Sequence, residues 1–355
     1  MKHWPPISPK NILLKMPNWL GDLVMATAAV ADIRKHFPDA KISALCLAGL
    51  GPLLKNDPNI DEVLTYTRPS GWIHRFEHYD LIQDIRQGEF DLGILFTNSF
   101  TSAYWFWRGQ VKERLGFQGN LRSCLLTKAE PFPKAREQQH LVTTYKELLK
   151  PLGVPLSATS PSLYLTDEEK QSAKELLVLK GIPGSAILLG INPGAAYGSA
   201  KCWLPERFVA VSQKLLANDQ LYIVYFGDQA GASLVDAICK ELPTERVINL
   251  SGKTSLRELM ALIASCSLFL TNDSGPMHMA AALKIPLVAL FGSTNDTSTG
   301  PYGGGKVIHK HVECSPCYKR VCPIDFRCMK QISVEEVYQE LEKLVKDPAH
   351  KQSLS

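Results

Sequence analysis

Short apolar segments that alternate with helical patterns are the feature that most limits how this chain can fold. The second half contains five runs that are apolar at nearly every position: AILLGINPG, LYIVYFG, RVINLSG, LFLTND and PLVALFG. Helical patterns separate them: LPERFVAVSQKLLAN, SLVDAICKEL, SLRELMALIASC and PMHMAAALK. Strands that are apolar on both faces and alternate with helices indicate a parallel sheet covered by helices on each side.

The first half of the chain shows the same alternation less clearly. NILLKM (11–16), KISALC and FDLGILFTN (90–98) predict strands, and DLVMATAAVADIRKHF predicts a helix after the first of them. The sequence therefore predicts an α/β protein with two doubly wound parallel sheets.

Proline and glycine are frequent around residues 155–185, which makes this segment the best linker candidate. We predict an N-terminal domain over residues 1–170 and a C-terminal domain over 184–330. A final amphipathic helix in 331–355 is expected to pack back on the N-terminal domain. Paired domains of this kind bind ligands in the cleft between them, at the carboxyl ends of strands.

Composition and charge narrow the function classes. The 355 residues, 45% hydrophobic and 21% charged, describe a soluble globular protein. A formal net charge of +4 is too small to predict a nucleic-acid partner, although it would not repel an anionic substrate. No apolar run reaches the roughly 18 residues of a membrane-spanning helix. The stretch MKHWPPISPKN lacks the apolar core of a secretory signal, so we expect a cytoplasmic protein.

Nine cysteines are consistent with a reducing compartment. Five scattered ones are expected to be buried thiols: Cys46, Cys124, Cys202, Cys239 and Cys266. The other four cluster in CSPCYKRVCPIDFRC: Cys314, Cys317, Cys322 and Cys328. A CxxC pair followed by two more cysteines has plausible zinc spacing, and the alternative is a reduced surface loop without metal. A metal bound here would staple the loop and would not take part in chemistry.

The usual phosphate-binding fingerprints of α/β enzymes are missing. A nicotinamide enzyme is expected to carry GxGxxG after the first strand and an acidic residue at the end of the second. Here the first turn is PNWLGD, with the single Gly21, and the second strand runs into LAGLGP without an acid. The P-loop pattern GxxxxGK(S/T) does not occur either.

The loop INPGAAYGSAKCW (191–203) follows a predicted strand and suits an anion. Its small residues let backbone N–H groups approach a phosphate, and Lys201 supplies a mobile positive charge. An ordinary connection with a solvated lysine is the alternative interpretation.

The stretch TNDSGPMHMAAAL (271–283) repeats this pattern two units later. Ser274 or Gly275 is expected to cap a helix whose N–H groups and positive dipole end favour a diphosphate. Asp273 can accept a hydrogen bond from a sugar hydroxyl, and His278 falls in the first turn. Two such loops at carboxyl strand ends of the same half strengthen the prediction of a nucleotide-sugar site.

Asp22 in PNWLGD places a carboxylate after the first strand, where a helix begins. It is either a helix cap or, in a cleft, a general base.

Together these motifs resemble one enzyme family. The strand–PNWLGDLVM–helix opening, LFTNSFTSA (95–103), PGAAYGSAKCW and TNDSGPMHMAAAL are similar to glycosyltransferase family 9, the ADP-heptose:lipopolysaccharide heptosyltransferases. The similarity spans nearly the whole chain, and NSF-x-SA and PGA-x-(Y/F)G-x-AK-x-W most resemble the heptosyltransferase II branch. The resemblance implies a GT-B fold, in which two Rossmann-like domains face each other across a cleft.

The resemblance also implies roles for individual residues. Asp22 matches the family's loop aspartate, the catalytic base, and Lys201 matches the lysine that stabilises the donor diphosphate. The implied ADP-heptose site comprises Gly21, Ala195, Ala196, Lys201, Gln229, Thr254, Asp273, Ser274, Gly275 and His278. Family members often have glutamate near the position of Gln229. No catalytic metal and no cofactor are expected.

The implied reaction is an inverting transfer of L-glycero-D-manno-heptose from ADP-heptose to a heptose of the lipopolysaccharide inner core. The basic and aromatic stretch 102–123 is expected to face this anionic, lipid-anchored acceptor, and a solvated basic face is the alternative. Predicted acceptor contacts are Asn98, Ser99, Arg108 and Arg122. Peripheral contact with the inner membrane would follow. Transfer of the first or third heptose, an NAD-dependent nucleotide-sugar enzyme and a non-catalytic ADP-sugar-binding protein stay as rival interpretations.

Overall fold

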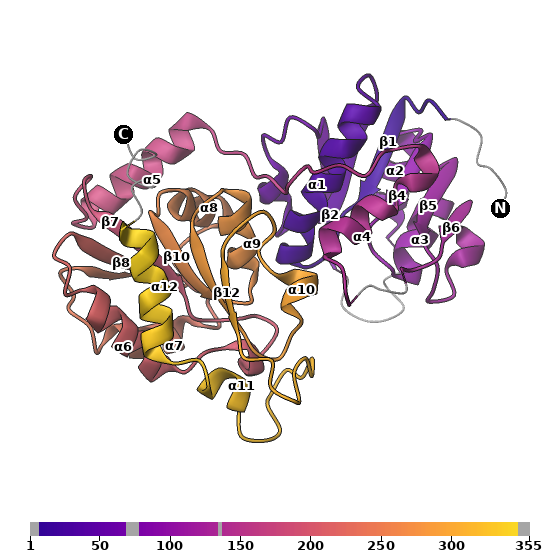
Figure 1. Cartoon of the computed structure of the whole chain (residues 1–355). Helices are drawn as coiled ribbons and strands as arrows, with labels where there is room; N and C mark the ends of the chain where they lie inside the picture. The colour runs from indigo at the N-terminus through magenta and orange to yellow at the C-terminus, as the bar shows by residue number, and fades with distance from the viewer. Residues whose placement is uncertain (1–6, 69–77, 134–136, 347–355) are drawn as a thin grey trace. The chain divides into compact units, whose positions relative to one another are not determined.

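The computed structural model describes residues 7–68, 78–133 and 137–346 (Figure 1). The chain divides into two compact units, Met1–Tyr164 and Leu165–Ser355. The division therefore falls before the predicted domain limits at residues 170 and 184.

The first unit contains a six-stranded parallel sheet in the order β3-β2-β1-β4-β5-β6. Its strands are β1 (Asn11–Lys15), β2 (Lys41–Leu47), β3 (Glu62–Tyr66), β4 (Leu92–Leu95), β5 (Glu113–Phe117) and β6 (Lys128–Glu130). Its helices are α1 (Leu20–His36), α2 (Tyr79–Gln87), α3 (Phe100–Arg108) and α4 (Leu141–Glu147). Helix α1 packs with α4, and α2 packs with α3.

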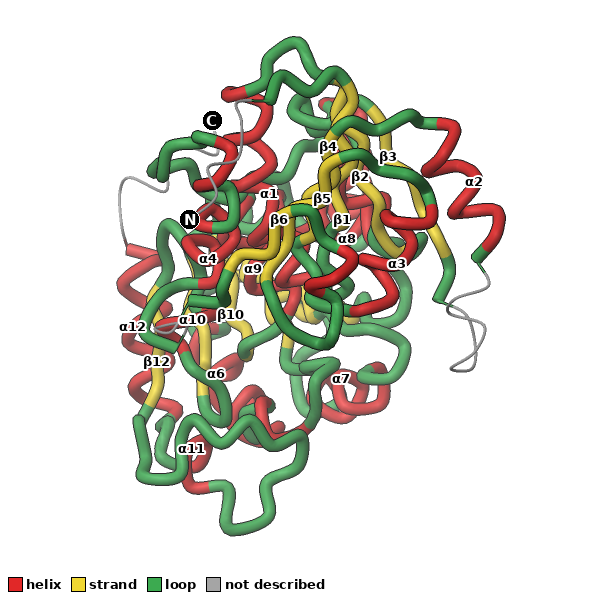
Figure 2. The backbone as a smooth tube through the Cα atoms, turned by 90° about the vertical axis from the view of Figure 1, so that its right-hand side faces the viewer, coloured by secondary structure: helices red, strands yellow, loops and turns green. Residues whose placement is uncertain are grey.

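The second unit contains another six-stranded parallel sheet, in the order β12-β11-β10-β7-β8-β9. Its strands are β7 (Ile187–Asn192), β8 (Leu221–Tyr225), β9 (Val247–Asn249), β10 (Leu268–Asn272), β11 (Leu287–Phe291) and β12 (Lys306–His309). Its helices are α5 (Asp167–Leu179), α6 (Pro205–Leu215), α7 (Ala232–Cys239), α8 (Leu256–Ala264), α9 (Gly275–Ala282), α10 (Asp296–Thr299), α11 (Arg327–Lys330) and α12 (Val334–Lys346). Figure 2 distinguishes these helices and strands along the backbone.

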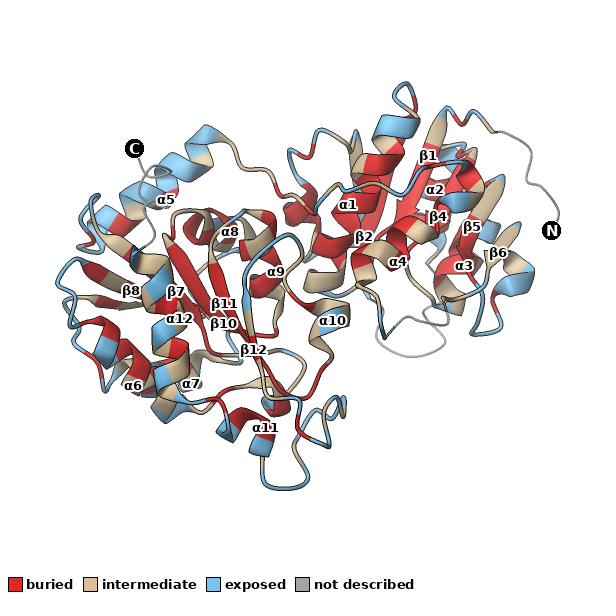
Figure 3. Cartoon of the chain, viewed as in Figure 1, coloured by how far each residue is buried: buried red, intermediate tan, exposed pale blue. Residues whose placement is uncertain are grey.

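The two sheets share one topology. If the strands of each unit are numbered in chain order, both sheets run 3-2-1-4-5-6, the order of doubly wound dinucleotide-binding folds. Strands β4, β10 and β11 are buried at every position, as runs that are apolar on both faces predict (Figure 3). The predicted fold class, two Rossmann-like α/β domains, is confirmed.

Helix α5 occupies the segment that the sequence analysis treated as a linker. Thr166 and Glu169 form a capping box at its start, since each side chain accepts a hydrogen bond from the backbone N–H of the other residue. The helix packs on α8, where Arg257 forms a two-pronged ion pair with Glu169. The pattern T-x-x-E, which marks this helix start in the sequence, was not among the signals used for the linker prediction.

The C-terminal helix α12 packs within the second unit, against α6, β10 and β11. Its Val337 and Leu341 are fully buried in the core cluster of that unit. Lys214 of α6 forms an ion pair with Glu335 at the start of α12. The apolar face of this helix is therefore covered by its own unit, and packing on the N-terminal domain stays a prediction.

The structure tests the predicted burial of the five scattered cysteines and the predicted lack of a membrane-spanning helix. Cys46 and Cys266 are buried as predicted, Cys202 and Cys239 are half-buried, and Cys124 is exposed, which contradicts the prediction for it. Among the described residues, every helix is too short or too polar to cross a membrane.

Candidate active site

Polar loops leave both sheets at equivalent positions. In the first unit, β1 and β4 are neighbours, and the chain continues from them to opposite sides, to β2 and β5. Strands β7 and β10 have the same relation in the second unit. Open α/β sheets bind ligands outside the carboxyl ends of strands at such a switch point. Asp22 follows β1, Lys201 follows β7 and Asp273 follows β10, so the predicted residues flank both switch points.

Lys201 and Asp273 form an ion pair at the switch point of the second unit. The Nζ of Lys201 lies 2.5 Å from Oδ2 of Asp273, and the hydroxyl of Thr294 donates to the same oxygen at 2.6 Å. The two charged side chains are only 14% and 5% exposed. Lys201 also lies over the ring of Tyr197, 4.8 Å from its centre. Little water screens this pair, so the ammonium group is held in one place.

Two asparagines, missed in the sequence analysis, join the loops that carry this pair. We call residues 193–203 the Lys201 loop and residues 273–274 the Asp273 loop. Asn192 ends β7 and donates to the hydroxyl of Ser274 at 3.3 Å. Asn272 ends β10, donates to the carbonyl oxygen of Pro193 at 2.6 Å and accepts from the N–H of Trp203 at 3.0 Å. An asparagine as the last residue of both central strands was the sequence signal for them.

Helix α9 begins at Gly275, directly after the Asp273 loop. Ser274 holds the N-cap position, but its side chain caps no helix N–H and lies 2.9 Å from the hydroxyl of Thr271. Of the two predicted cap residues, Ser274 is thus the N-cap, although it makes no side-chain cap hydrogen bond. Because the side chain of Ser274 does not cap them, the N–H groups at the start of α9 can donate to an anion. His278 is buried one turn into the helix.

The remaining predicted donor residues lie along the same edge of the second sheet. Gln229 follows β8 and is exposed, and Thr254 follows β9 and is half-buried. The N–H of Gly252 donates to the carbonyl oxygen of Gly227 at 2.9 Å, which joins these two loops. In the Lys201 loop, Ala195 is half-buried and Ala196 is exposed. Their contacts with a ligand stay predictions.

Asp22 lies in the first turn of α1, on the wall of a cavity of about 450 Å³ within the first unit. Trp19 holds the N-cap position, so the alternative interpretation of Asp22 as the cap is wrong. Gly21 precedes Asp22 in the same turn and is half-buried. Burial raises the pKa of the Tyr145 hydroxyl in the cavity wall, and the charge of Asp22 raises it further. Tyr145 therefore keeps its proton beside a carboxylate.

Two of the predicted acceptor residues, Asn98 and Ser99, line the same cavity as Asp22. Ser99 is the N-cap of α3, where its hydroxyl accepts from the N–H of Ser102 at 3.2 Å. Arg108 lies at the other end of this nine-residue helix, exposed and outside the cavity wall. The structure thus brings Asn98 and Ser99 to Asp22 but leaves Arg108 apart.

Arg122 is fully buried, so the prediction that it contacts an acceptor directly is wrong. Its guanidinium donates to the carbonyl oxygens of Phe117 and Thr97 and to Oδ1 of Asn98. Burial lowers its pKa to about 10, and it stays charged at neutral pH. The basic pattern in 102–123 could not predict that Arg122 binds backbone carbonyl oxygens. A sequence does not distinguish such an arginine from a solvated one.

Lys15, at the end of β1, is a buried cation that the sequence analysis did not single out. Its Nζ donates to the carbonyl oxygen of Met16 at 2.8 Å and to Oδ1 of Asn18 at 3.1 Å. The hydroxyl of Tyr66 donates to the same oxygen at 2.9 Å. Burial lowers the pKa of Lys15 to about 7. This cluster fixes the turn that leads into Asp22.

The two sheets, with polar loops at both switch points, define an α/β protein of the GT-B type. Comparison with known proteins agrees: the model of glycosyltransferase family 9 (heptosyltransferase) matches residues 78–326. The chain belongs to this family and is a glycosyltransferase.

Three relatives illustrate the similarity. Lipooligosaccharide heptosyltransferase 2 of Campylobacter jejuni is 30% identical over 344 residues, which cover 95% of this chain and 99% of the relative. Lipopolysaccharide heptosyltransferase 2 of Escherichia coli K12 is 30% identical over 300 residues, 82% of this chain and 85% of the relative. The structure of E. coli ADP-heptose LPS heptosyltransferase II superposes with a TM-score of 0.80 at 25% identity, over 97% of this chain and all of that one.

Proposed function

We propose that this protein is a heptosyltransferase of type II, which transfers L-glycero-D-manno-heptose from ADP-heptose to a heptose of the lipopolysaccharide inner core with inversion. The buried Lys201–Asp273 pair beside the start of α9 is the observation that carries this proposal. It holds the Lys201 ammonium group beside the N–H donors at the start of α9, where a nucleotide diphosphate would bind. The two heptosyltransferase 2 relatives, similar over most of their length, support the same activity.

The donor half of the reaction belongs to the second unit. When the bond from the anomeric carbon to the diphosphate breaks, negative charge develops on the departing ADP. Lys201 and the N–H groups of α9 oppose that charge without having to move, which is how preorganised sites lower a barrier. Asp273 orients Lys201 and is available to a sugar hydroxyl.

The acceptor half belongs to the first unit. A hydroxyl of the acceptor heptose attacks the anomeric carbon, a new C–O bond forms, and Asp22 takes the proton as general base. Asn98, Ser99 and Arg68 share the cavity wall with Asp22 and offer hydrogen bonds and a positive charge to an anionic sugar. The buried Arg122 donates a hydrogen bond to the side chain of Asn98 and so orients it toward the acceptor.

One assay tests this function and its rivals. Purified protein receives ADP-heptose and synthetic or truncated inner-core acceptors with no, one or two heptoses, and mass spectrometry identifies the products. We expect addition of one heptose to the acceptor that already carries a single heptose. Transfer to the heptose-free acceptor or to the two-heptose acceptor would assign a type I or type III activity. Donor binding without any product would indicate a binding protein, and bound NAD seen by absorbance would indicate a nucleotide-sugar redox enzyme.

We also propose that the protein works at the cytoplasmic face of the inner membrane, where a lipid-anchored acceptor would be found. Trp107 and Arg108 are both exposed on α3 and offer an aromatic ring and a positive charge to anionic lipid. Sedimentation with anionic and with neutral vesicles tests this. Binding to anionic vesicles that Trp107→Ala/Arg108→Ala abolishes would support it, and equal recovery with both vesicle types would count against it.

A further inference from the structure

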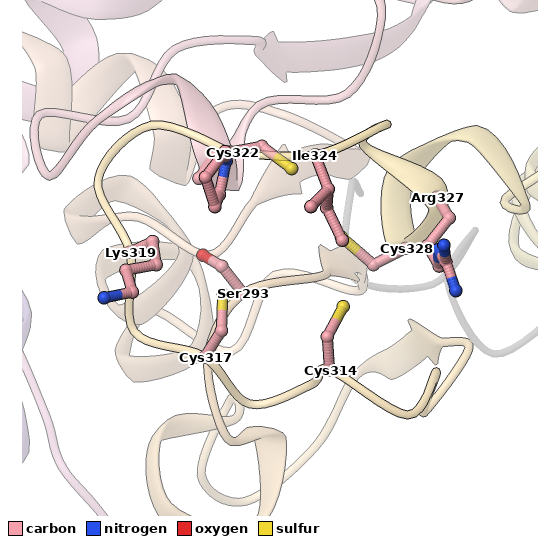
Figure 4. Close-up of a pocket in the computed structure, with 10 residues that line it drawn as sticks. Ser293, Cys314, Cys317, Lys319, Cys322, Ile324, Arg327 and Cys328 are labelled. Atoms are coloured by element: carbon pink, nitrogen blue, oxygen red, sulfur yellow. The ribbon is translucent and has the colours of Figure 1, made fainter.

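All four clustered cysteines line one cavity of the second unit. Cys314, Cys317, Cys322 and Cys328 surround a cavity of about 90 Å³, and their sulfur atoms point toward it (Figure 4). All four are free thiols. Cys328 lies deepest: it is buried, and a Cβ added at Gly292 would lie 3.0 Å from its sulfur. Four thiols that converge on one cavity, without disulfides, are an unusual arrangement for a plain surface loop.

Three of these thiols lie in a segment without regular secondary structure. Residues 310–326, between β12 and α11, form no helix or strand, and Figure 2 shows this stretch as loop. Several of its large apolar side chains face solvent, Val321 at 69% and Ile324 at 57% exposure. Val312, near the start of the segment, is buried in the core of the unit. A long irregular loop with few buried apolar side chains commonly depends on a cross-link or on a bound ion.

We propose that the four cysteines form a structural metal site, in which a thiophilic divalent ion, Zn²⁺ or Fe²⁺, is bound by four thiolates. Four sulfur ligands in tetrahedral arrangement are typical of structural zinc and of iron–sulfur coordination. No three of these thiols lie within 4.8 Å of one another in the part of the chain that the structure describes, so binding draws them together around the ion. Each thiol that ligates releases one proton, four in total.

The charges around the cavity suit such a cluster. A divalent ion with four thiolates carries a net charge of −2, and cationic neighbours stabilise thiolates. Lys319 and Arg327 line the cavity. Arg327 also pairs with Asp325 and Glu313, so part of its charge is already compensated.

The proposed site would also support the Lys201 loop. Between Cys317 and Cys322, the carbonyl oxygen of Arg320 accepts from the N–H of Ala200 at 3.0 Å, next to Lys201. The carbonyl oxygen of Tyr318 accepts from the hydroxyl of Tyr197 at 2.7 Å. A Cβ at Gly198 would lie 2.3 Å from the Arg320 oxygen, so only glycine permits this close approach. An ion that fixes residues 317–322 would therefore limit the motion of the loop that holds Lys201.

Metal content of the intact protein tests the proposal directly. The chain is purified under reducing conditions without chelator, and elemental analysis distinguishes zinc from iron. We expect roughly one ion per chain in the natural sequence and less than about a tenth of that in Cys314→Ser/Cys317→Ser. Cys124→Ser, which removes an exposed thiol of the first unit, is the matched control and should keep the ion.

A second measurement serves if the double variant does not fold. The natural chain, stripped of metal and checked by circular dichroism, is titrated anaerobically with Co²⁺. Saturation near one equivalent, with thiolate-to-cobalt charge-transfer bands, supports the site. Amide exchange of residues 194–201 should also slow several-fold when the ion is bound. The proposal is overturned if the natural chain holds no zinc or iron and shows no such bands, or if the double variant keeps its metal.

Discussion

Lys201 and Asp273 meet at 2.5 Å although 72 positions separate them in the sequence. Each was expected to contact the donor separately, Lys201 on the diphosphate and Asp273 on the sugar. The structure joins them in one hydrogen-bonded cluster with Thr294. Five predictions follow from this pair and from the other clusters described above.

Replacement of Lys201 by alanine should lower turnover by about 10²–10³-fold, because it removes positive charge that opposes the departing diphosphate. The melting temperature should fall as well, because the substitution leaves the buried carboxylate of Asp273 without its cation, so rates are compared at a temperature at which the variant is folded. Steady-state transfer rates and thermal unfolding measure both effects. Lys240→Ala, at the exposed C-terminal end of α7, is the control and should keep full activity. An unchanged rate in Lys201→Ala would refute the leaving-group role.

The effects of Lys201→Ala and Asp273→Asn should not add. If Asp273 acts mainly by orienting Lys201, the double variant loses about as much activity as the more damaged single variant. A double-mutant cycle on kcat/KM measures this coupling. Fully additive losses would show that the two residues serve the donor independently.

Asp22→Asn should lower turnover by about 10²–10⁴-fold, the usual contribution of a general base, and leave folding intact. Asp39→Asn, at an exposed position after the same helix, is the control. Transfer assays with the single-heptose acceptor and circular dichroism test the pair of variants. Near-normal turnover in a folded Asp22→Asn protein would exclude Asp22 as the base.

The stability of the first unit should depend on a buried ion pair that joins α1 to α4. Lys146 lies 3.5 Å from Asp32, with both side chains nearly inaccessible, and the hydroxyl of Ser157 bonds both of them. Lys146→Ala should lower the free energy of unfolding by about 3–5 kcal/mol, because it leaves a buried carboxylate unpaired. Lys150→Ala breaks an exposed pair with Glu147 and should cost less than about 1 kcal/mol. Urea denaturation compares the two, and similar losses would contradict the prediction.

Lys15 should make stability rise with pH in the alkaline range. Burial lowers its pKa to about 7 in the folded chain, whereas an unfolded lysine titrates near about 10.4. Between these values the unfolded chain binds the proton and the folded chain does not, so the free energy of unfolding increases with pH. Below pH 7 both states are protonated and the cost of the buried charge is fully present.

Substitution Lys15→Met should remove this dependence. Urea denaturation at pH 7 and pH 9 should give a smaller difference in unfolding free energy for Lys15→Met than for the natural chain. Lys35→Met, an exposed lysine on α1, should leave the difference unchanged. If the unfolding free energies of the natural chain and of Lys15→Met changed equally between pH 7 and pH 9, Lys15 would not titrate in this range.

The sequence by itself determined the fold class and the positions of the polar loops. Runs that are apolar on both faces and alternate with helical patterns are a local signal, and they predicted two parallel sheets without any knowledge of strand order. The predicted residues Asp22, Lys201 and Asp273 all follow strands at the switch points. Each position could be predicted because a strand end and a helix start are marked by neighbouring residues.

Only the tertiary structure decided which distant residues meet. The pairing of Lys201 with Asp273 and Thr294 depends on strand order, which brings β7 beside β10 and β10 beside β11. The burial of Arg122 and the packing of α12 on α6 likewise depend on which surfaces are covered. A local pattern shows that a side chain is charged or that a helix has an apolar face. It does not specify the partner, because the partner comes from a remote part of the chain.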